Sequence, residues 1–590
     1  MTSWPGGDGR LAATATATAL AVAACLCVLP FIVTLALTSA PFGRRPGTPA
    51  QVPYAIPFVR NTFQFAPDVE GFISSMIRRF DGKPFRFFAG ADTFYFVPYG
   101  EPVLALFRQM RDMTSKPLVT AVLRGQLGVP RQDVAIWARD DSGINVKPLP
   151  GSEDIDPAQR IFFLSHQGLH DGLAGTAGLT GMLARFVANY TARLRAAPVV
   201  AGESWVGMPD VFEFFKREMF HGTSPALCGE NLLRLSPGFA DDFWAFDKNM
   251  MTYLRRVPRW FAPEAYAARD RAIESVDKWR QHAAETFDEG FADAEFEPAW
   301  GARLMRNRAD MFRGLGISDR GTAAVDFGLI WAANSNAILS TVWAMVFVHR
   351  SPGLARRVRA ETEACFDVRT GSFDVAALCS KPLLSSVHME TLRVTVGAST
   401  ARNALTDNFE LDGKWAMERD AIILTINWFG AHDADFWNTG RVLASSGKPE
   451  HPVDEFWAER FLEYPGDPAS GPIRKPDASI YSAPALDDKP DGTRREKTAE
   501  DDKTATLVTT GLQGHYYPFG GGQNICPGRF FAKQSALAAL AITMREFDIE
   551  FPDADTAWNV QPNKGNFPVG TCHPDRKVPV KLRRRQNKSN

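Results

Sequence analysis

The chain has 590 residues, and its 66 Lys and Arg against 67 Asp and Glu give a net charge of -1, which excludes the strongly basic surface typical of nucleic-acid binding. Hydrophobic residues make up 45% of the chain and can build a large core. The seven cysteines are scattered without a paired framework, which indicates a reducing compartment. Length alone suggests about four domains of roughly 150 residues, but no linker divides the chain into parts with separate cores.

The N-terminal region begins with an uncharged run, residues 11–42. Its apolar core, Ala19 to Leu37, is long enough to span a bilayer at about 20 residues. A cleaved signal peptide is the alternative, with the only small-residue cleavage site directly before Pro41. We favour a retained anchor because the run is long for a signal peptide. Arg44 and Arg45 follow, and the positive-inside tendency then places the body of the protein in the cytosol.

Prolines recur from Pro46 to Pro57, which predicts a stiff hinge. Two β-rich runs follow within residues 85–100, and the short break at Ala89-Gly90-Ala91 predicts a hairpin. From Pro102 to about Thr370, apolar residues recur at the helical period, so we expect mostly helices there.

His166 and His170 lie four residues apart on one of these predicted helices. A zinc site would need a further ligand and a Glu between them, and the segment has neither. A role on the surface or in the core is the simpler interpretation.

A segment without charge, Phe327 to Met345, runs for more than four helical turns. Such a helix is expected to be buried on all sides. It contains Asn334, Ser335 and Asn336, and buried amides must find hydrogen-bond partners. Core amides bonded to the backbone are one interpretation, and a helix that crosses a bound cofactor is the other.

Two charged segments further on can form an ion pair. Glu390 and Arg393 are three residues apart on a predicted helix and share one face. Arg460 follows in a Glu-Arg-Phe turn. Residues 466–514 are rich in Pro, Asp, Lys and Thr, so we expect a disordered surface insertion.

A glycine-rich loop within Tyr517 to Lys533 brings one cysteine to the start of a helix. Apolar residues at the helical period follow Cys526, which predicts that Pro527 occupies the first helical position. Unpaired backbone donors and the helix dipole are then expected to lower the pKa of the Cys526 thiol. The absence of side chains lets a flat, bulky partner approach the backbone at Gly520, Gly521, Gly522 and Gly528.

Three chemistries compete for this loop. A phosphate cradle would need a preceding strand and a Lys-Ser/Thr pair, which the loop does not have. A catalytic thiol needs a histidine base, and His515 is close in sequence but has no further signature around it. The third possibility is a single thiolate that holds a haem.

The loop resembles the signature of the haem-thiolate cytochromes, the cytochrome P450 superfamily: Phe, two residues, Gly, three residues, Cys, one residue, Gly. Phe519, Gly522, Cys526 and Gly528 fill all four positions. The resemblance extends from about Pro46 to Arg585. It implies a mainly α fold with a small β region, and a haem bound by these four residues with Cys526 as the axial metal ligand.

The resemblance also implies roles for other residues. Glu390, Arg393 and Arg460 match a structural lock that the family builds next to the cysteine segment. Arg402, in a predicted strand, and His170 resemble contacts to the haem propionates.

Most members of the family have an acid followed by Thr in the central helix, for proton delivery during oxygen activation. Ser335 and Asn336 stand at these positions, and we take them as candidate catalytic residues. A branch that resembles sterol 7α-hydroxylases and prostacyclin synthase also has Asn at the Thr position. That branch includes both an oxygenase and an isomerase.

The function implied is a monooxygenase that hydroxylates or otherwise oxidises an apolar small molecule, such as a terpenoid, a sterol or another lipid-like metabolite. It would use O2 and electrons from an NADPH-dependent reductase. The alternatives are an isomerase or dehydratase that acts on a peroxide without a reductase, and a membrane haem protein without turnover. By the same resemblance, residues 1–42 are a single-pass anchor in the endoplasmic reticulum membrane, and residues 43–590 form a cytosolic catalytic domain.

Overall fold

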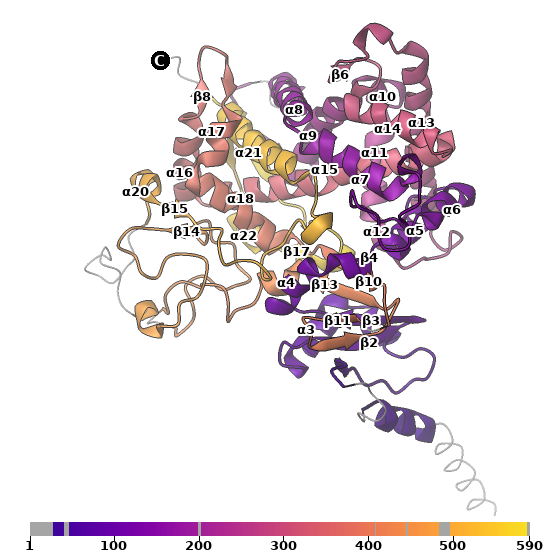
Figure 1. Cartoon of the computed structure of the whole chain (residues 1–590). Helices are drawn as coiled ribbons and strands as arrows, with labels where there is room; N and C mark the ends of the chain where they lie inside the picture. The colour runs from indigo at the N-terminus through magenta and orange to yellow at the C-terminus, as the bar shows by residue number, and fades with distance from the viewer. Residues whose placement is uncertain are drawn as a thin grey trace, which may run out of the picture. The chain divides into compact units, whose positions relative to one another are not determined.

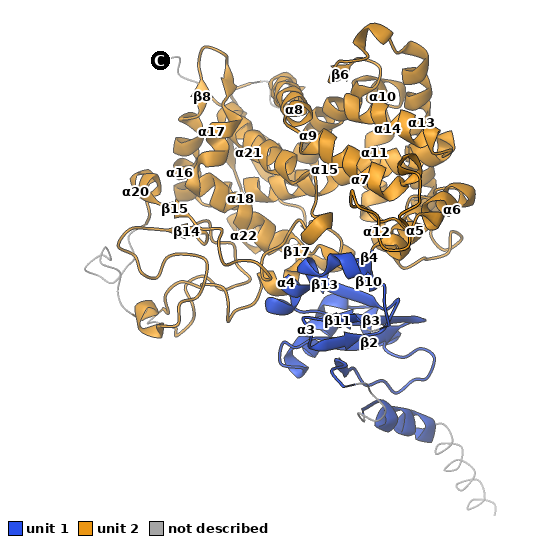
Figure 2. Ribbon diagram, in the orientation of Figure 1, with its two compact units in different colours: residues 1–114, 401–425 blue, residues 115–400, 426–590 orange. Residues whose placement is uncertain are grey.

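The computed structural model describes residues 28–39, 46–198, 202–407, 409–443, 446–482 and 496–586. Most of them lie in helices, as expected, and the strands are short (Figure 1). The chain divides into two units, one of residues 1–114 and 401–425 and one of residues 115–400 and 426–590 (Figure 2).

The first unit is built on a six-stranded sheet in the order β1-β2-β3-β13-β10-β4. The predicted hairpin is present, because β2 and β3 pair antiparallel with Phe85 opposite Phe96. Strand β13 runs parallel to β3, and β4 pairs antiparallel with β10. The strands are β1 (Ala50–Gln51), β2 (Phe85–Ala89), β3 (Asp92–Phe96), β4 (Met113–Thr114), β10 (Ser399–Ala404) and β13 (Ile422–Ile426).

Short helices and a second hairpin complete this unit. The helices are α2 (Thr62–Phe65), α3 (Val69–Arg79) and α4 (Glu101–Arg108), and the hairpin is β11 (Phe409–Leu411) with β12 (Trp415–Met417). Phe87 is fully buried and stacks on Phe94 across the sheet, with 5.0 Å between ring centroids. Burial of each such ring stabilises the fold by roughly 1.5–3 kcal/mol.

The second unit contains most of the helices. They are α5 (Lys116–Gly125), α6 (Arg131–Arg139), α7 (Ile161–Leu173), α8 (Thr176–Ala196), α9 (Val211–Cys228), α10 (Asn231–Leu235), α11 (Phe239–Lys248), α12 (Met250–Leu254), α13 (Pro263–Thr286), α14 (Arg303–Gly314), α15 (Asp319–His349), α16 (Pro352–Glu363), α17 (Val375–Ser380), α18 (Pro382–Thr395), α19 (Asn427–Ala431), α20 (Ala499–Thr504), α21 (Arg529–Glu546) and α22 (Ala554–Asn559). Its three-stranded sheet has the order β16 (Phe547–Glu550), β19 (Val580–Arg584), β5 (Val206–Met208).

Helix α15 is the central element of this unit and contains the uncharged segment of the sequence analysis. It packs against α9, α13, α18 and α21. Ser318 caps its N-terminus, accepting a hydrogen bond from the Gly321 N–H at 3.1 Å. Asp326 is fully buried and receives Arg308 Nε at 2.9 Å and a guanidinium nitrogen of Arg280. One carboxylate thus fastens α13 and α14 to α15.

Part of α15 differs from the prediction that the helix is buried on all sides. Ala332 and Asn336, one turn apart in the middle of the helix, are exposed, and Trp331, Ala333 and Ala337 beside them are half-buried. The uniform apolar pattern does not predict this strip, because it gives the hydrophobicity of each position and not which neighbouring elements cover it. The second unit therefore leaves one face of its central helix uncovered.

Both described flanks of the expected insertion, residues 466–482 and 496–514, carry regular structure. Helix α20 has a capping box between Thr498 and Asp501, and β15 (Thr506–Leu507) pairs with β14 (Leu462–Glu463). Asp502 is buried and accepts two hydrogen bonds from Arg357, at 2.7 and 2.8 Å. A composition rich in charge predicts disorder only while the charges stay solvated, and here a buried partner orders the segment. The centre of the expected insertion, residues 483–495, lies outside the described residues.

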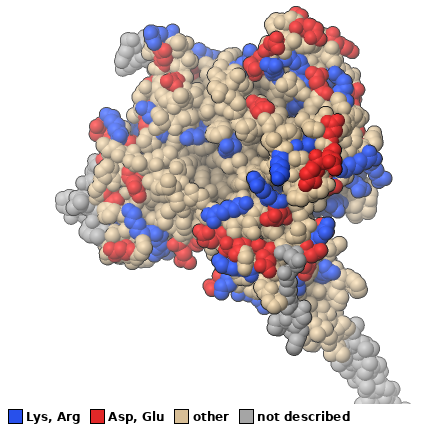
Figure 3. All heavy atoms as spheres, in the orientation of Figure 1, with Lys and Arg blue, Asp and Glu red and all other residues tan. Residues whose placement is uncertain are grey.

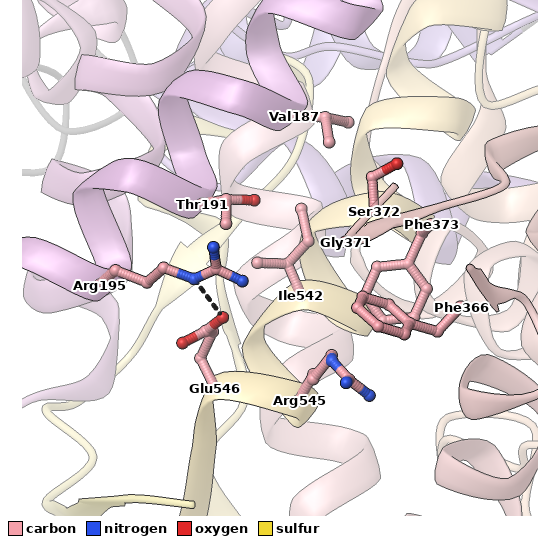
Figure 4. A pocket seen from close by; sticks show the side chains of 10 residues that line it. All are labelled: Val187, Thr191, Arg195, Phe366, Gly371, Ser372, Phe373, Ile542, Arg545 and Glu546. Atoms are coloured by element: carbon pink, nitrogen blue, oxygen red, sulfur yellow. Dashed lines mark hydrogen bonds and ion pairs between the residues drawn. The ribbon is translucent and has the colours of Figure 1, made fainter. Parts of the chain in front are cut away.

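Two hollows lie in the described part of the second unit, and the larger, of about 460 Å³, is an open groove beside α16 and residues 450–459. On the face in Figure 3, the basic and acidic side chains of the described residues are interspersed. Figure 4 shows a cavity beside the Arg195–Glu546 ion pair, whose atoms Nε and Oε1 are 2.9 Å apart. Its volume of about 10 Å³ is room for roughly one water molecule, too little for an organic ligand.

Candidate functional site

The cysteine loop, residues 517–528, is closed by its own backbone. The Gly520 N–H donates to the Tyr517 carbonyl at 2.9 Å, and the Cys526 N–H donates to the Phe519 carbonyl at 3.0 Å. Gly520 and Gly522 have φ values of 72° and 63°, in the left-handed region that favours glycine. Phe519 and Cys526 of the signature are therefore joined directly, and Gly522 permits the turn between them.

Gly528 keeps space open beside the sulfur. A Cβ atom at this position would lie 3.8 Å from Cys526 Sγ and 4.0 Å from Leu173 Cδ1. Cys526 itself is exposed. An exposed thiol beside a position without a side chain fits a flat, bulky group that approaches the sulfur.

Two predictions about Cys526 are wrong. Helix α21 begins at Arg529 with Gly528 as its N-cap, so Pro527 precedes the helix and does not occupy its first position. Although Cys526 is exposed, desolvation by neighbouring atoms raises the pKa of its thiol. The N–H groups of Gly528 and Arg529 and the Arg529 guanidinium act in the opposite direction but are outweighed. The free thiol keeps its proton, which a bound metal would displace.

The structure brings together all three residues of the predicted lock. Arg393 donates to both oxygens of Glu390, from Nε at 2.7 Å and from Nη2 at 2.9 Å. Arg460 Nε donates to Glu390 Oε1 at 2.9 Å. All three side chains are fully buried. Burial alone would raise the pKa of Glu390, but the two guanidinium groups lower it to about 2.

The lock is connected to the segment that leads into the cysteine loop. Arg393 Nη1 donates to the carbonyl of Ala431, the last residue of α19, at 2.7 Å. Asn427, the first residue of α19, accepts from the Tyr517 N–H at 2.7 Å. His515, considered above as a catalytic base, stacks on Phe436 at 3.8 Å and lies 3.4 Å from Asp433. Its position is accounted for by packing.

Asn336 holds the C-terminal turn. Its Oδ1 accepts from the Thr571 N–H at 2.8 Å, and its backbone carbonyl accepts from Thr571 Oγ1 at 3.2 Å. A Cβ at Gly570 would lie 1.9 Å from Asn336 Oδ1, so only glycine fits there. The Thr571 N–H takes one of the two acceptor sites of Oδ1, so Asn336 keeps its Nδ2 donors and one acceptor site.

Ser335 points to a carboxylate that the sequence analysis did not single out. Its hydroxyl donates to Asp247 Oδ1 at 2.5 Å, and both residues are buried. Asp247 belongs to α11, 88 positions earlier in the chain. Asp247 is one of several acidic residues in α11, and nothing in the sequence distinguishes it from the others. Only the tertiary structure reveals its contact with Ser335.

The two histidines of α7 differ in their surroundings. His166 Nε2 lies 3.2 Å from the carbonyl of Gln523 in the cysteine loop, and desolvation lowers its pKa. His170, the residue singled out by the resemblance, has a side chain that is 58% exposed and lies 4.0 Å from Asp171. The histidine in contact with the loop is therefore His166.

Arg402 lies in β10 and is buried. Its Nη1 donates to the Ala401 carbonyl at 2.6 Å, whereas Nε has no hydrogen-bond partner among the described residues. Desolvation lowers the pKa of this guanidinium to about 10. A buried guanidinium with an unused donor is suited to an anionic group.

Comparison with known proteins identifies the family. A family model described as "Cytochrome P450" matches residues 501–574, which include the cysteine loop. Cytochrome P450 monooxygenase fsoE of Humicola fuscoatra is 30% identical over 550 residues, covering 91% of this chain and 88% of that protein. The chain belongs to the cytochrome P450 family. Cytochrome P450 monooxygenase efuG of Hormonema carpetanum is also 30% identical, over 583 residues and 95% of each chain.

A sterol hydroxylase is among the more distant relatives. The human 7-alpha-hydroxycholest-4-en-3-one 12-alpha-hydroxylase is 26% identical over 291 residues, 47% of this chain and 48% of that protein. This match agrees with the sterol-hydroxylase branch that the sequence resembles.

Membership of the family establishes the general activity. The protein is a haem-thiolate monooxygenase, an oxidoreductase that acts on an organic substrate with O2 and electrons from a reductase. The residues present fit a haem. In the second unit, an exposed thiol beside Gly528 and an exposed strip on α15 each suit a flat, bulky group. In the first unit, the buried Arg402 has an unused donor that suits a carboxylate.

The lock supports a prediction about stability. Arg393→Ala leaves the buried Glu390 carboxylate short of one of its two cations, so we expect a loss of about 3–5 kcal/mol in the free energy of unfolding. Because the lock is linked to the cysteine loop through α19, the variant should also bind less haem. Denaturant unfolding and haem absorbance measure the two effects.

Arg313→Ala is the matched control. Arg313 also pairs with an acid three residues away, Asp310 at 3.1 Å, but both side chains are about two-thirds exposed. Arg313→Ala should lower the free energy of unfolding by no more than about 1 kcal/mol. Equal, small losses in the two variants would contradict the proposed importance of the lock.

Proposed function

We propose that Cys526 is the axial ligand of the haem and that this monooxygenase hydroxylates or otherwise oxidises an apolar small molecule, such as a terpenoid, a sterol or another lipid-like metabolite. The observation that carries the proposal is the closed cysteine loop. In this loop the Cys526 N–H donates a hydrogen bond to the Phe519 carbonyl, and Cys526 lies beside Gly528. The haem supplies the activation of molecular oxygen, which electron donation from a thiolate favours.

The other proposed site residues act around this centre. Phe519, Gly522 and Gly528 shape the loop, and the lock of Glu390, Arg393 and Arg460 fixes the segment before it. The guanidinium of Arg402 is proposed to bind a haem propionate through its unused Nε donor. His170 is proposed for the same role by resemblance alone, and the contact of His166 with the loop makes His166 the better-supported residue of the pair.

Asn336 and Ser335 are the proposed catalytic residues. The Thr571 N–H takes one acceptor site of Asn336 Oδ1, so Asn336 can offer its Nδ2 donors and the remaining acceptor site to a water molecule or to a polar group of the substrate. An amide orients such a group but relays a proton less readily than a hydroxyl. The names of the relatives support an oxygenase over the peroxide isomerase considered above.

Residues 1–42 are proposed to anchor the protein in the endoplasmic reticulum membrane, with the catalytic domain, residues 43–590, in the cytosol. Within the described part of this segment, Val28–Ser39 is an apolar helix whose large side chains are mostly exposed, for example Ile32 at 58% and Leu37 at 68%. Residues 1–27 lie outside the described residues. Among the described helices, only α15 is long and apolar enough to cross a bilayer, and 67% of its apolar window is buried in the protein.

The ligand assignment predicts a spectroscopic result. Reduced protein with carbon monoxide should absorb at the red-shifted wavelength of a thiolate-ligated haem, and Cys526→Ala should lose this absorption. Cys379→Ala, which removes a half-buried thiol elsewhere in the chain, should keep it. A histidine-type spectrum of the unaltered protein would refute the assignment.

The proposed role of Asn336 predicts how oxygen is used. Membranes that contain the protein and a reductase, supplied with a panel of sterols, terpenoids and fatty acids, should consume NADPH and place an atom of molecular oxygen in a product. Asn336→Leu should keep haem but lose most coupled turnover, because the hydrophobic side chain offers no donor. Conversion of a fatty-acid hydroperoxide without NADPH, with no isotope from oxygen gas in the product, would favour the isomerase.

The anchor predicts a separation of membrane binding from folding. A chain that begins at Arg44 should still incorporate haem but lose most of its association with membranes, because the apolar run ends before the first strand of the sheet. Sedimentation of membranes and haem absorbance measure the two properties. Full-length protein found cleaved after Ala40 in the secreted fraction would overturn the topology.

A further inference from the structure

Asp247 joins three segments that are distant in sequence. Its Oδ1 accepts from Trp331 Nε1 at 2.7 Å and from Ser335 Oγ at 2.5 Å, both on α15. Its Oδ2 lies 2.8 Å from His573 Nε2 in β18 (His573–Pro574). Its backbone carbonyl accepts from Asn566 Nδ2 at 3.2 Å. One residue of α11 thus binds the middle of α15 and both ends of the C-terminal segment 566–573.

The carboxylate is ionised in this position. Its side chain is only 5% exposed, and burial alone would raise the pKa of Asp247. Hydrogen bonds from His573, Ser335 and Trp331 outweigh burial, so the pKa lies below its usual value. An ionised carboxylate only accepts, so His573 donates through Nε2, and three donors converge on one buried anion.

The groups that Asp247 holds lie on both sides of Asn336. Ser335 precedes Asn336 in the chain, and Trp331 lies about one turn before it on α15. On the other side, the segment 566–573 carries Thr571, whose N–H fixes the orientation of the Asn336 amide. Asp247 therefore holds both α15 and the segment 566–573, which carry the two partners of the hydrogen bond between Asn336 and Thr571.

A comparison with Asp133 separates this arrangement from ordinary helix attachment. Asp133 of α6 is also buried and accepts from a serine hydroxyl of α15, Ser318 Oγ, at 2.5 Å. That contact lies at the N-terminal cap of α15, whereas Asp247 acts at the exposed strip. The two carboxylates share their chemistry and differ in position along one helix.

We propose that Asp247 is a positioning residue for the oxidation: it fixes the turn of α15 that carries Asn336 and, through His573, the C-terminal segment that orients the Asn336 amide. This inference rests on the proposed function of Asn336. A displacement of about 1 Å in a group that orients reactants can cost up to about a hundredfold in rate, so a fixed support is required.

The test uses full-length protein with haem and a reductase, and Asp247→Asn as the variant. Asparagine keeps the size and one acceptor but replaces the second oxygen with an NH2 group, which cannot accept from His573. Haem content should stay unchanged. Hydrogen exchange of peptides that cover residues 566–574 should accelerate several-fold, because the segment loses a charged contact.

The catalytic readout is the hydrogen peroxide released per NADPH oxidised during turnover of a sterol, terpenoid or fatty acid that the panel identifies as a substrate. We expect Asp247→Asn to raise this ratio by about twofold or more, since a misplaced donor wastes reducing equivalents. Asn336→Leu should raise it in the same way, and the double variant should add little, because both changes affect one contact. Asp133→Asn should leave the ratio and the exchange of residues 566–574 unchanged.

Normal exchange and a normal peroxide ratio in Asp247→Asn would overturn the proposal, and so would equal changes in Asp133→Asn. If Asp247→Asn fails to bind haem, Trp331→Phe decides, because it removes one donor to Asp247 and leaves Ser335 and Asn336 in place: an unchanged ratio overturns the proposal and a raised ratio supports it. The failure of this inference can be told apart from the failure of the proposed function. If Asn336→Leu does not change the ratio, the proposed role of Asn336 is refuted, whatever Asp247→Asn does.

Discussion

The second unit depends on one buried carboxylate. Glu390 accepts hydrogen bonds from Arg393 and Arg460 while all three side chains are removed from water. Burying three charges is unfavourable unless their hydrogen bonds are satisfied, and here both guanidinium groups also donate to backbone carbonyls, such as those of Ala431 and Glu455. The arrangement has few alternatives of similar energy. It therefore fixes α18, α19 and the segment before Arg460 in one geometry.

The lock also restrains the cysteine loop, through α19. Helix α19 is held at one end by Arg393 and itself accepts the Tyr517 N–H at the other. Cys526 needs such support because its own surroundings do not stabilise a thiolate in the free protein, where desolvation raises its pKa.

Helix α15 combines a buried length with an exposed middle turn. Most of its length is core, fastened by Asp326 to two neighbouring helices, and its middle turn is left uncovered at Ala332 and Asn336. A polar residue in such a turn would be free to rotate if nothing held it. Thr571 and Asp247 supply that restraint from two other segments. The middle turn of the helix is thus held by residues that are distant in the chain.

The sequence by itself determined the helical class and the hairpin at residues 85–96, because both depend on local periodicity. The cysteine signature and the order of the lock residues were recognised by their resemblance to the family pattern. Only the tertiary structure decided that α21 starts at Arg529, that the thiol pKa is raised, that residues 496–514 are ordered by Asp502, and that Asp247 reaches Ser335. These features depend on desolvation and on contacts between residues far apart in the chain. Periodicity and composition carry no information about either, since both describe only neighbours along the sequence.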